Sequence, residues 1–198
     1  DVNSVGRIPL VYLRRTPLEG WGRVFKRSVD IVCSIVALAM LMPVFAVVAI
    51  VIMLDTPGPV FVVLRRVSRN RTFGLIKFRS MVENAEALKP ALEQFNERAD
   101  GPSFKMRHDP RITRVGRVLR KYRIDELPQF VNVFLGDISL VGPRPHQPDE
   151  IARYQKHHKK VLAIKAGATG LAQASGSSDL SFEEEVALDT FYIENWSF

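Results

Sequence analysis

The chain has 198 residues and a net charge of +7, so its expected partners are anionic: nucleic acid, anionic lipid or a phosphorylated substrate. Its single cysteine, Cys33, excludes a disulfide framework and a cysteine-based zinc cluster, and indicates a reducing compartment. Because the chain starts at Asp1 without a methionine and stops after Phe198, we expect it to be a fragment of a longer protein.

Residues 1–29 are rich in proline, glycine and arginine, and are predicted to form a linker and interfacial arm whose Trp21 and Phe25 anchor at a membrane surface. Residues 31–54 then give 24 positions without a charge, more than the roughly 20 that a helix needs to cross the hydrocarbon of a bilayer. The sequence therefore predicts a membrane helix over residues 30–55.

Pro43 and the charges on both flanks bear on the form of this helix. Basic residues both precede and follow the apolar stretch, and the positive-inside rule places either flank in the cytoplasm. A re-entrant helix that bends at Pro43 and returns to the same side satisfies both flanks, because proline removes a helical hydrogen bond and supplies a kink. The freed carbonyl needs a partner, such as Ser34 or neighbouring protein. We favour this form, whereas hydropathy alone favours an ordinary kinked spanning helix.

Residues 56–198 are predicted to form one cytoplasmic domain with its own core. The β-branched and aromatic runs at 60–64 and 73–78, around a polar turn at 68–72, predict a β-hairpin. A polar helix is expected over 82–99, with Pro90 as an interruption. The helix expected over 111–121 sets basic residues opposite apolar ones, which is typical of a helix on anionic headgroups and equally of a solvated charged face.

The segment Ile124-Asp125-Glu126-Leu127-Pro128-Gln129 carries the strongest local chemical signal. Aspartate is a preferred N-cap and proline is tolerated in the first turn, so a helix is predicted to start at Asp125. The helix dipole and the upstream Arg120 and Arg123 favour negative charge there, so Asp125 is expected to stay ionised and nucleophilic, or the site to bind phosphate. The alternative is a structural cap beside a glutamate, which is the commoner case for such a pair alone.

The segment Pro143-Arg144-Pro145 favours the chemical interpretation. Two prolines around one arginine predict a rigid loop that holds a guanidinium in a fixed place. Such a planar fork suits bidentate recognition of phosphate. The alternative is that Arg144 is an ordinary surface charge, but a surface charge does not need a rigid loop with a proline on each side.

The motifs of the chain and the order in which they occur resemble those of the bacterial sugar transferase family, the monotopic phosphoglycosyl transferases. The resemblance covers about 170 residues. It is carried by Lys26-Arg27 with Asp30, Pro43, Pro57-Gly58-Pro59-Val60-Phe61, Lys77-Phe78-Arg79-Ser80-Met81, Asp109-Pro110-Arg111-Ile112-Thr113, Asp125-Glu126-Leu127-Pro128-Gln129, Gly136-Asp137-Ile138-Ser139-Leu140-Val141-Gly142-Pro143-Arg144-Pro145, Thr169-Gly170-Leu171-Ala172-Gln173, and Asp189 followed by Tyr192 and Asn195-Trp196-Ser197.

The resemblance implies transfer of a sugar-1-phosphate from a UDP-sugar to undecaprenyl phosphate, initiating exopolysaccharide, capsule or O-antigen type assembly. Asp125 is then expected to attack the sugar-proximal phosphorus, release UMP and carry the phosphosugar until the polyprenyl phosphate displaces it. Glu126 tunes or positions Asp125, because helical neighbours point about 100° apart. Mg²⁺ is the implied cofactor, with Asp125 as its ligand. The implied substrate-binding residues are Lys77, Arg79, Arg120, Arg144, Gln173 and Asp189.

The expected fold is α+β and mainly helical. It combines a re-entrant, proline-kinked membrane helix with a cytoplasmic catalytic domain that has amphipathic surface helices and a short β-hairpin. The implied location is the cytoplasmic face of the bacterial inner membrane, among its lipids and without nucleic acid. Larger members of the family carry further membrane helices upstream, and such a missing region is expected to support a homodimer.

The chain departs from the usual family pattern at four positions. Ala166 replaces a proline, Ser177 an arginine, Glu185 a basic residue and Ser68 a glycine. The loss of an arginine at Ser177 bears on the affinity for the nucleotide sugar. Two rival interpretations are a membrane-anchored module that binds anionic lipid or nucleic acid without catalysis, and a scaffold of an export complex. Neither explains the acidic pair beside a braced arginine.

Overall fold

The computed structural model describes residues 2–5, 8–11, 21–97, 101–102, 104, 106, 108–176 and 180–196. Strands β1 (Val2–Val5) and β2 (Ile8–Val11) pair antiparallel within the segment predicted to be a linker. The helix that follows begins at Trp21, so it includes the last part of the predicted interfacial arm.

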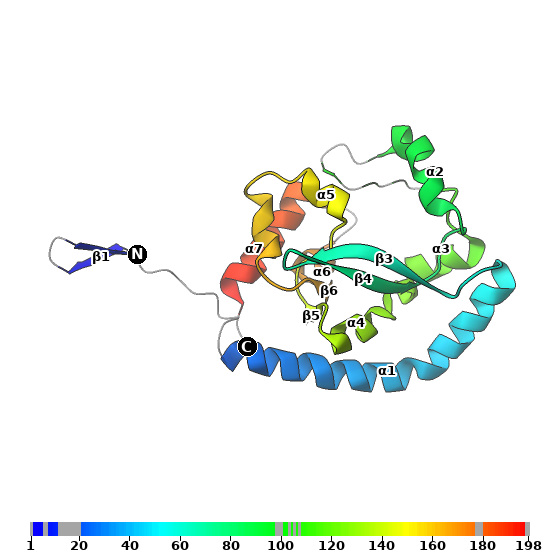
Figure 1. Cartoon of the computed structure of the whole chain (residues 1–198), viewed down its shortest axis with the longest axis horizontal. Helices are drawn as coiled ribbons and strands as arrows, with labels where there is room; N and C mark the ends of the chain where they lie inside the picture. Colours follow the sequence, from blue (N-terminus) through cyan, green and yellow to red (C-terminus); the bar gives the residue numbers. More distant parts are fainter. Residues whose placement is uncertain are drawn as a thin grey trace.

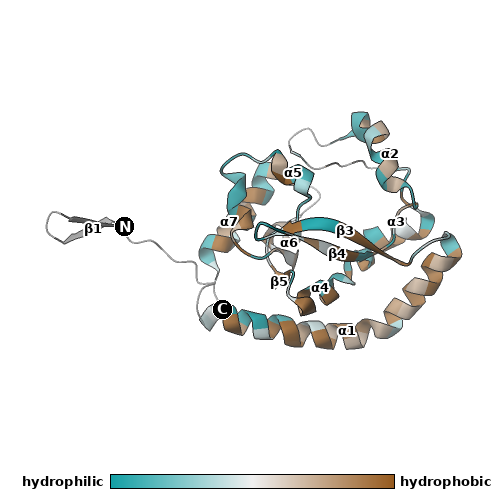
Figure 2. Ribbon diagram, in the orientation of Figure 1, coloured by the Kyte–Doolittle hydropathy of each residue, from teal (hydrophilic) through white to brown (hydrophobic). Residues whose placement is uncertain are grey.

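Helix α1 (Trp21–Asp55) is 35 residues long and lies along one side of the rest of the chain (Figure 1). Its outward face is largely apolar (Figure 2), and large side chains on it are exposed, such as Met40 at 73% and Leu54 at 82%. By length and composition the helix is able to cross a membrane. An exposed apolar surface of this extent indicates association with a membrane.

Pro43 lies inside α1, and the helix changes direction in its second half without being broken (Figure 1). Proline lacks the amide that would bond the carbonyl of Ala39. The suggestion that Ser34 supplies the missing donor is wrong, because its hydroxyl donates to the carbonyl of Ile31 at 2.9 Å. That α1 is re-entrant stays a prediction.

Strands β3 (Phe61–Ser68) and β4 (Arg71–Phe78) form the predicted antiparallel hairpin, with Leu64 opposite Leu75. Both strands reach further than the sequence predicted. The connection is only Arg69 and Asn70, whose φ angles of 48° and 60° are those of a tight I′-type turn. The longer first strand places Arg66 on the same face as Leu64.

Helices α2 (Ala85–Leu92) and α3 (Arg114–Lys121) replace the longer helices predicted over 82–99 and 111–121. Pro90 stays within α2, which gives way to the 3₁₀ turn η1 (Glu93–Phe95). The helix α3 starts three residues later than predicted because Thr113 is its N-cap and accepts a 2.9 Å bond from the amide of Gly116.

The chain then passes through the 3₁₀ turn η2 (Ile124–Glu126) into helix α4 (Gln129–Leu135), which ends at Gly136 with φ 91°. The remaining elements are β5 (Ser139–Val141), α5 (Pro148–Ala152), η3 (His158–Leu162), β6 (Gly167–Thr169), α6 (Leu171–Ala174) and α7 (Phe182–Asn195). Strands β5 and β6 are parallel, and Ser181 with Glu184 forms a capping box at the start of α7. A mainly helical fold with a short hairpin is thus confirmed.

Three apolar clusters form the core. The second half of α1 contributes Val48 and Ile52, which pack with Phe78 of β4 and Leu119 of α3. A second cluster joins the hairpin to α4 and β6, and a third lies around Phe182 between η3 and α7. One end of the apolar helix is therefore part of the domain core rather than an appendage.

Polar contacts fasten both ends of α1 to the same domain. Near its start, Arg27 donates to two carbonyls at the end of α4, at 2.6 and 2.7 Å. The buried carboxylate of Asp30 accepts a 2.8 Å bond from the hydroxyl of Ser139 on β5. At the other end, Asp55 accepts a 3.2 Å bond from the amide of Val115 in the first turn of α3. These bonds fix the helix to the elements that carry the candidate site.

Candidate active site

A cavity of about 550 Å³ opens between the hairpin, α2, α3, η2 and the loop after β5. Its volume lies in the range of small-molecule sites. Seven of the eight catalytic and substrate-binding residues predicted from the sequence line it: Lys77, Arg79, Arg120, Asp125, Glu126, Arg144 and Gln173. The eighth, Asp189, is not among the lining residues.

Asp125 and Glu126 belong to the 3₁₀ turn η2 and not to the start of an α-helix. Arg123, with φ 55°, turns the chain sharply out of α3, and Pro128 occupies the N-cap position of α4 instead. The prediction that Asp125 caps a helix is therefore wrong. Asp125 is 6% exposed as a residue, whereas the side chain of Glu126 is 34% exposed.

The pKa values of the two adjacent carboxyl groups are shifted in opposite directions from their ordinary values. Burial raises the pKa of Asp125, helped by the charge of Glu126, although Lys77 and Arg120 oppose the change. Burial also acts on Glu126, but the ammonium of Lys77 and the guanidinium of Arg144 outweigh it and lower the pKa. Burial thus acts on the pKa of Asp125 against the direction that the helix dipole and the upstream arginines suggested, and that Asp125 is ionised stays a prediction. A desolvated carboxylate is a stronger nucleophile once it has lost its proton.

Lys77 lies on β4 with its Nζ 2.6 Å from Oε1 of Glu126. Arg120, on the last turn of α3, donates from Nε to the hydroxyl of Ser80 at 2.9 Å. Gly116 permits this approach, because a Cβ there would collide with the backbone of Ser80. The cavity wall thus presents two fixed cations near the acidic pair.

Arg79 lines the cavity and also binds the residues that follow α1. Its guanidinium donates to the carbonyls of Pro57 and Thr56, both at 2.6 Å, and the side chain is buried. These carbonyls directly follow α1, where a helix leaves acceptors unpaired. Most of the donor capacity of Arg79 therefore holds the end of the apolar helix in place.

Arg144 follows β5 in a loop whose flanking prolines are both buried. The loop is attached to β6 by bonds from the amide of Gly142 to the carbonyl of Thr169, at 2.9 Å, and from the amide of Gly167 to the carbonyl of Pro143, at 2.8 Å. Arg144 itself is exposed at the cavity wall, where its charge acts on Glu126. The predicted proline-flanked loop is present and places Arg144 at the cavity wall, and that it fixes the guanidinium stays a prediction.

Gln173 and Asp189 come from two helices that follow this loop in the chain. Gln173 of α6 lines the cavity, and its buried Oε1 has no hydrogen-bond partner among the described residues. Asp189 of α7 is buried, and burial and then the charge of Glu185 raise its pKa to about 7, while Arg144 opposes the change. The structure therefore places Asp189 within electrostatic reach of the loop but outside the cavity lining.

The sequence matches a known family over this whole region. Residues 21–198 match the family described as bacterial sugar transferase. The chain belongs to the bacterial sugar transferase family. The predicted resemblance is confirmed, and an enzyme that transfers sugar phosphates is favoured over the binding module and the scaffold.

Three relatives indicate the range of this family. The chain is 40% identical over 180 residues to the exopolysaccharide production protein ExoY of Sinorhizobium fredii, covering 89% of this chain and 80% of that one. It is 44% identical to the undecaprenyl-phosphate galactose phosphotransferase of Salmonella typhimurium, covering 88% of this chain but 37% of that one. It is 38% identical to an N-acetylgalactosaminephosphotransferase of Aeromonas hydrophila that acts on undecaprenyl phosphate, covering 87% and 40%.

The sequence analysis did not identify two features of the cavity wall as parts of the site, Arg66 and the ion pair of Arg111 with Asp109. Arg66 lines the cavity beside Arg144, and the same strand face carries Val62 and, across the hairpin, Lys77. The period-two alternation would have revealed Arg66 had β3 been predicted to its full length. Arg111 forms a fork on Asp109, with bonds of 2.9 and 2.7 Å that lower the pKa of that carboxyl.

The carboxylates of the cavity fit a magnesium ion in their chemistry, because Mg²⁺ prefers oxygen ligands and usually takes only one or two from the protein. Two of them form ion pairs, Glu126 with Lys77 and Asp109 with Arg111, and Glu150 lies 3.6 Å from Nδ1 of His146. The raised pKa of Asp125 shows that this group lacks enough nearby positive charge to offset its burial. Asp125 is therefore one wall carboxylate suited to a metal, beside Glu83 and Glu86, which also line the cavity.

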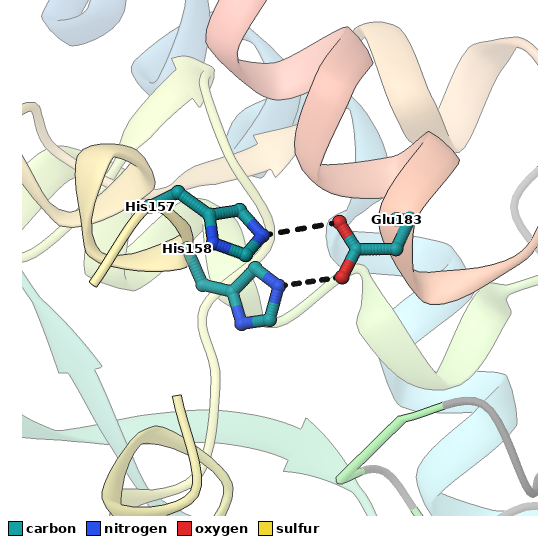
Figure 3. Close-up of side chains that lie close together, drawn as sticks. All are labelled: His157, His158 and Glu183. Atoms are coloured by element: carbon teal, nitrogen blue, oxygen red, sulfur yellow. Dashed lines mark hydrogen bonds and ion pairs between the residues drawn. The ribbon is translucent and has the colours of Figure 1, made fainter. Parts of the chain in front are cut away.

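A second cluster, His157, His158 and Glu183, lies outside the cavity lining and joins η3 to the start of α7 (Figure 3). Both ring Nε2 atoms face the one carboxylate, at 3.3 and 2.7 Å. However, Nδ1 of His158 accepts the amide of Gln155 at 3.1 Å, so the ring proton is on Nε2. That nitrogen then has no lone pair for a metal. The hydrogen bonds of the cluster instead connect η3 to the start of α7.

Proposed function

We propose that the protein transfers a sugar-1-phosphate from a UDP-sugar to undecaprenyl phosphate. The observation that carries this proposal is the pairing of a buried Asp125 with an ion-paired Glu126 in one cavity that also presents Lys77, Arg120 and Arg144. Such a wall suits a diphosphate, whose negative charge the three cations offset. The names of the Salmonella and Aeromonas relatives support the lipid acceptor.

The reaction divides into two displacements at one phosphorus. In the first, the carboxylate of Asp125 attacks the phosphorus that bears the sugar, the bond to the bridging oxygen breaks, and UMP leaves with that oxygen. In the second, a phosphate oxygen of undecaprenyl phosphate attacks the same phosphorus and Asp125 leaves as a carboxylate. The products are UMP and undecaprenyl diphosphate sugar. An aspartyl intermediate suits two bulky anionic substrates, because they need not meet directly.

The neighbours of Asp125 have separate tasks in this scheme. Glu126 holds the ammonium of Lys77 beside the nucleophile, at 2.6 Å. Arg120 is oriented by the hydroxyl of Ser80, and Arg144 by its proline-flanked loop. Both guanidinium groups stabilise charge on the transferring phosphoryl oxygens. A Mg²⁺ ion held by Asp125 would add positive charge to the same oxygens and lower the pKa of that carboxyl.

The lipid acceptor requires the cavity to lie close to a membrane. The apolar helix α1 can anchor the domain there. Its two ends are bound to the same domain, through Asp30 and Ser139 at one end and Asp55 and Val115 at the other. This arrangement supports a helix that enters and leaves the bilayer on one side, bent at Pro43. We place the domain at the cytoplasmic face of a bacterial inner membrane, where UDP-sugars are available.

The first test is release of UMP from a panel of UDP-sugars by the chain in lipid nanodiscs with Mg²⁺. The covalent step predicts exchange of labelled UMP into the UDP-sugar without any undecaprenyl phosphate, which is the signature of ping-pong kinetics. Asp125→Asn should abolish both release and exchange, and Asp137→Asn, outside the cavity lining, is the matched control. Release that requires the lipid and occurs without exchange would contradict the aspartyl intermediate. No release from folded protein with any sugar would favour a binding module.

A further inference from the structure

Arg66 is a cation of the cavity wall that the proposed reaction does not yet use. It lies on β3, is half-buried and lines the cavity. The next residue, Val67, packs in the core cluster around Phe182. Because successive side chains of a strand point to opposite faces, β3 directs the guanidinium of Arg66 into the cavity.

Arg66 has no hydrogen bond or ion pair with the residues that the structure describes. Other cations of the wall are occupied: Lys77 donates to Glu126 at 2.6 Å, and Arg120 donates to the hydroxyl of Ser80 at 2.9 Å. A guanidinium carries five N–H donors, and leaving them unpaired in a partly buried place is costly. An anion bound in the cavity would pair with them.

The carboxylate of Glu150 is close enough to act on Arg66 but does not bond to it. It accepts a 2.8 Å bond from the amide of Gln147 and lies 3.6 Å from Nδ1 of His146. Burial lowers the pKa of Arg66, and the charge of Glu150 opposes the change. Since arginine keeps its charge in proteins, Arg66 is a cation whose donors are free for a ligand.

Arg144 is a second unpaired guanidinium beside Arg66, again among the described residues. The end of its loop is attached to β3, where the amide of Val67 donates to the carbonyl of His146 at 3.0 Å. Both arginines line the one cavity, and the charge of Arg144 acts on Arg66. Two like charges repel each other until an anion lies between them. Such a pair suits a phosphate, whose oxygens accept paired bonds from a guanidinium.

The hairpin separates Arg66 from the cation beside the nucleophile. Lys77, the partner of Glu126, stands opposite Val62 in the register of the two strands. Arg66 follows Val62 by four residues, which is about 13 Å along the strand at about 3.3 Å per residue. Side chains that start this far apart suit two joined phosphates better than a single phosphoryl group.

We propose that Arg66, together with Arg144, forms the subsite for the uridine-side phosphate of the UDP-sugar, and that Arg66 stabilises the charge this phosphate gains as UMP leaves. When Asp125 bonds to the sugar-bearing phosphorus, the bridging oxygen departs with the electron pair of its broken bond, so UMP gains one negative charge. A cation fixed at that phosphate lowers the barrier of the step. Arg144, whose charge also acts on Glu126, serves both phosphates. The inference rests on the proposed function and adds to it a residue for the leaving group.

The subsite is tested by calorimetric binding of UMP to the full chain in lipid nanodiscs. Arg66→Met keeps a side chain of similar reach without its charge, and should weaken UMP binding about 10- to 100-fold, since a charge-assisted contact is lost. Arg65→Met is the matched control, because Arg65 is the exposed neighbour outside the cavity lining and should leave UMP binding unchanged. Equal UMP affinity in wild type and Arg66→Met, or an equal loss in Arg65→Met, would overturn the proposal.

Thermal unfolding separates this role from a structural one. An unpaired, partly buried cation does not stabilise the free protein, so Arg66→Met should leave Tm unchanged or raise it. UMP should raise the Tm of the wild type and of Arg65→Met, and that of Arg66→Met much less, because a ligand of the folded state stabilises it. A lower Tm of Arg66→Met without ligand would show that the fold needs this side chain, and would overturn its assignment as a free phosphate ligand.

Steady-state kinetics decide which phosphate Arg66 holds. With undecaprenyl phosphate in the nanodiscs, Arg66→Met should raise KM for the UDP-sugar and the inhibition constant of UMP about tenfold or more, and should slow the exchange of labelled UMP. KM for undecaprenyl phosphate should not change. A rise confined to KM for undecaprenyl phosphate would assign Arg66 to the acceptor and would overturn the proposal.

The inference and the function on which it rests fail on different results. A wild-type chain that neither releases nor exchanges UMP with any UDP-sugar would count against the proposed function, while calorimetry with UMP would still test the subsite. Normal turnover with unaltered UMP affinity in Arg66→Met would leave the transferase standing and remove only the role of Arg66.

Discussion

The backbone N–H of Ala166 donates a 3.1 Å hydrogen bond to the hydroxyl of Ser68, 98 residues earlier in the chain. Both residues are buried, where an unmatched donor or acceptor is costly. Both are also positions where the resemblance to the family leads us to expect another residue, proline at 166 and glycine at 68. A proline has no N–H to donate and a glycine has no hydroxyl to receive it, so the two changes compensate each other.

This relationship predicts coupled stability effects. Ala166→Pro alone leaves the hydroxyl of Ser68 without its donor, and Ser68→Gly alone leaves the amide of Ala166 without its acceptor. Each should lower the free energy of unfolding by about 1–3 kcal/mol. The double variant removes both partners and should lose about 1 kcal/mol less than the sum of the two. Denaturant unfolding of the four proteins measures the coupling, and strictly additive losses would show that the bond contributes nothing.

We expect substitution of Arg79 to affect stability more than substrate binding. Its bonds to the carbonyls of Thr56 and Pro57 close the end of α1, and a lysine cannot reproduce this fork. Arg79→Lys should lower the free energy of unfolding by about 3 kcal/mol. In protein that remains folded, KM for the UDP-sugar should change by less than about threefold. A large rise in KM at unchanged thermal stability would instead make Arg79 a substrate ligand.

Much of the architecture was predictable because it depends on local patterns. The uncharged stretch around Pro43 indicated the long helix, and alternation indicated the hairpin. The bounds were less accurate where a cap or turn decided them, as at Thr113 and at Arg69. Those residues define an element through hydrogen bonds and dihedral angles that hydropathy does not express.

The candidate site was predictable as a set of residues and less so as chemistry. The motifs named seven lining residues, but the state of Asp125 depends on burial by segments far away in the sequence. The helix dipole and the nearby arginines both favour a lower pKa for Asp125, whereas burial, which acts in the other direction, is not visible in a local segment of sequence. The effect of Arg144 on the pKa of Asp189 acts between a loop and α7, 45 positions apart, which no spacing rule describes.

Lys77 and Glu126 should shift the pH profile of the first step in opposite directions. Lys77 lowers the pKa of Asp125 and Glu126 raises it. Lys77→Met should therefore move the acidic limb of UMP release to higher pH, with kcat reduced about 100-fold or more because a cation at the phosphoryl group is lost. Glu126→Gln should move the limb to lower pH. The double variant should lie between them, and a limb that does not move in either single variant would mean that Asp125 does not set it.

Asp189 also predicts how stability depends on pH. Its pKa is about 7 in the folded protein and near 3.8 in an unfolded chain, so the folded state holds this proton more tightly. Stability should therefore fall as the pH rises between these two values, by at most about 1.4 kcal/mol per pH unit. Glu150, whose pKa the His146 side chain and the Gln147 amide lower to about 2 despite burial, acts below this range and in the opposite sense. Asp189→Asn should flatten the slope of Tm between about pH 5 and 7, and an unchanged slope would contradict a buried, neutral Asp189.

The topology of α1 can be decided with two cysteines in a Cys33→Ala background. Trp21 begins the helix and Pro59 follows it, and both are exposed to solvent or lipid at the helix ends. If α1 is re-entrant, Trp21→Cys and Pro59→Cys should both react with a membrane-impermeant maleimide in inverted inner-membrane vesicles, and neither in intact spheroplasts. The bonds of Asp30 and Asp55 to one domain require this result, because a straight span would pull one of them out of contact. Labelling of one cysteine from each side would establish a spanning helix and would require one end of α1 to leave the domain in the membrane.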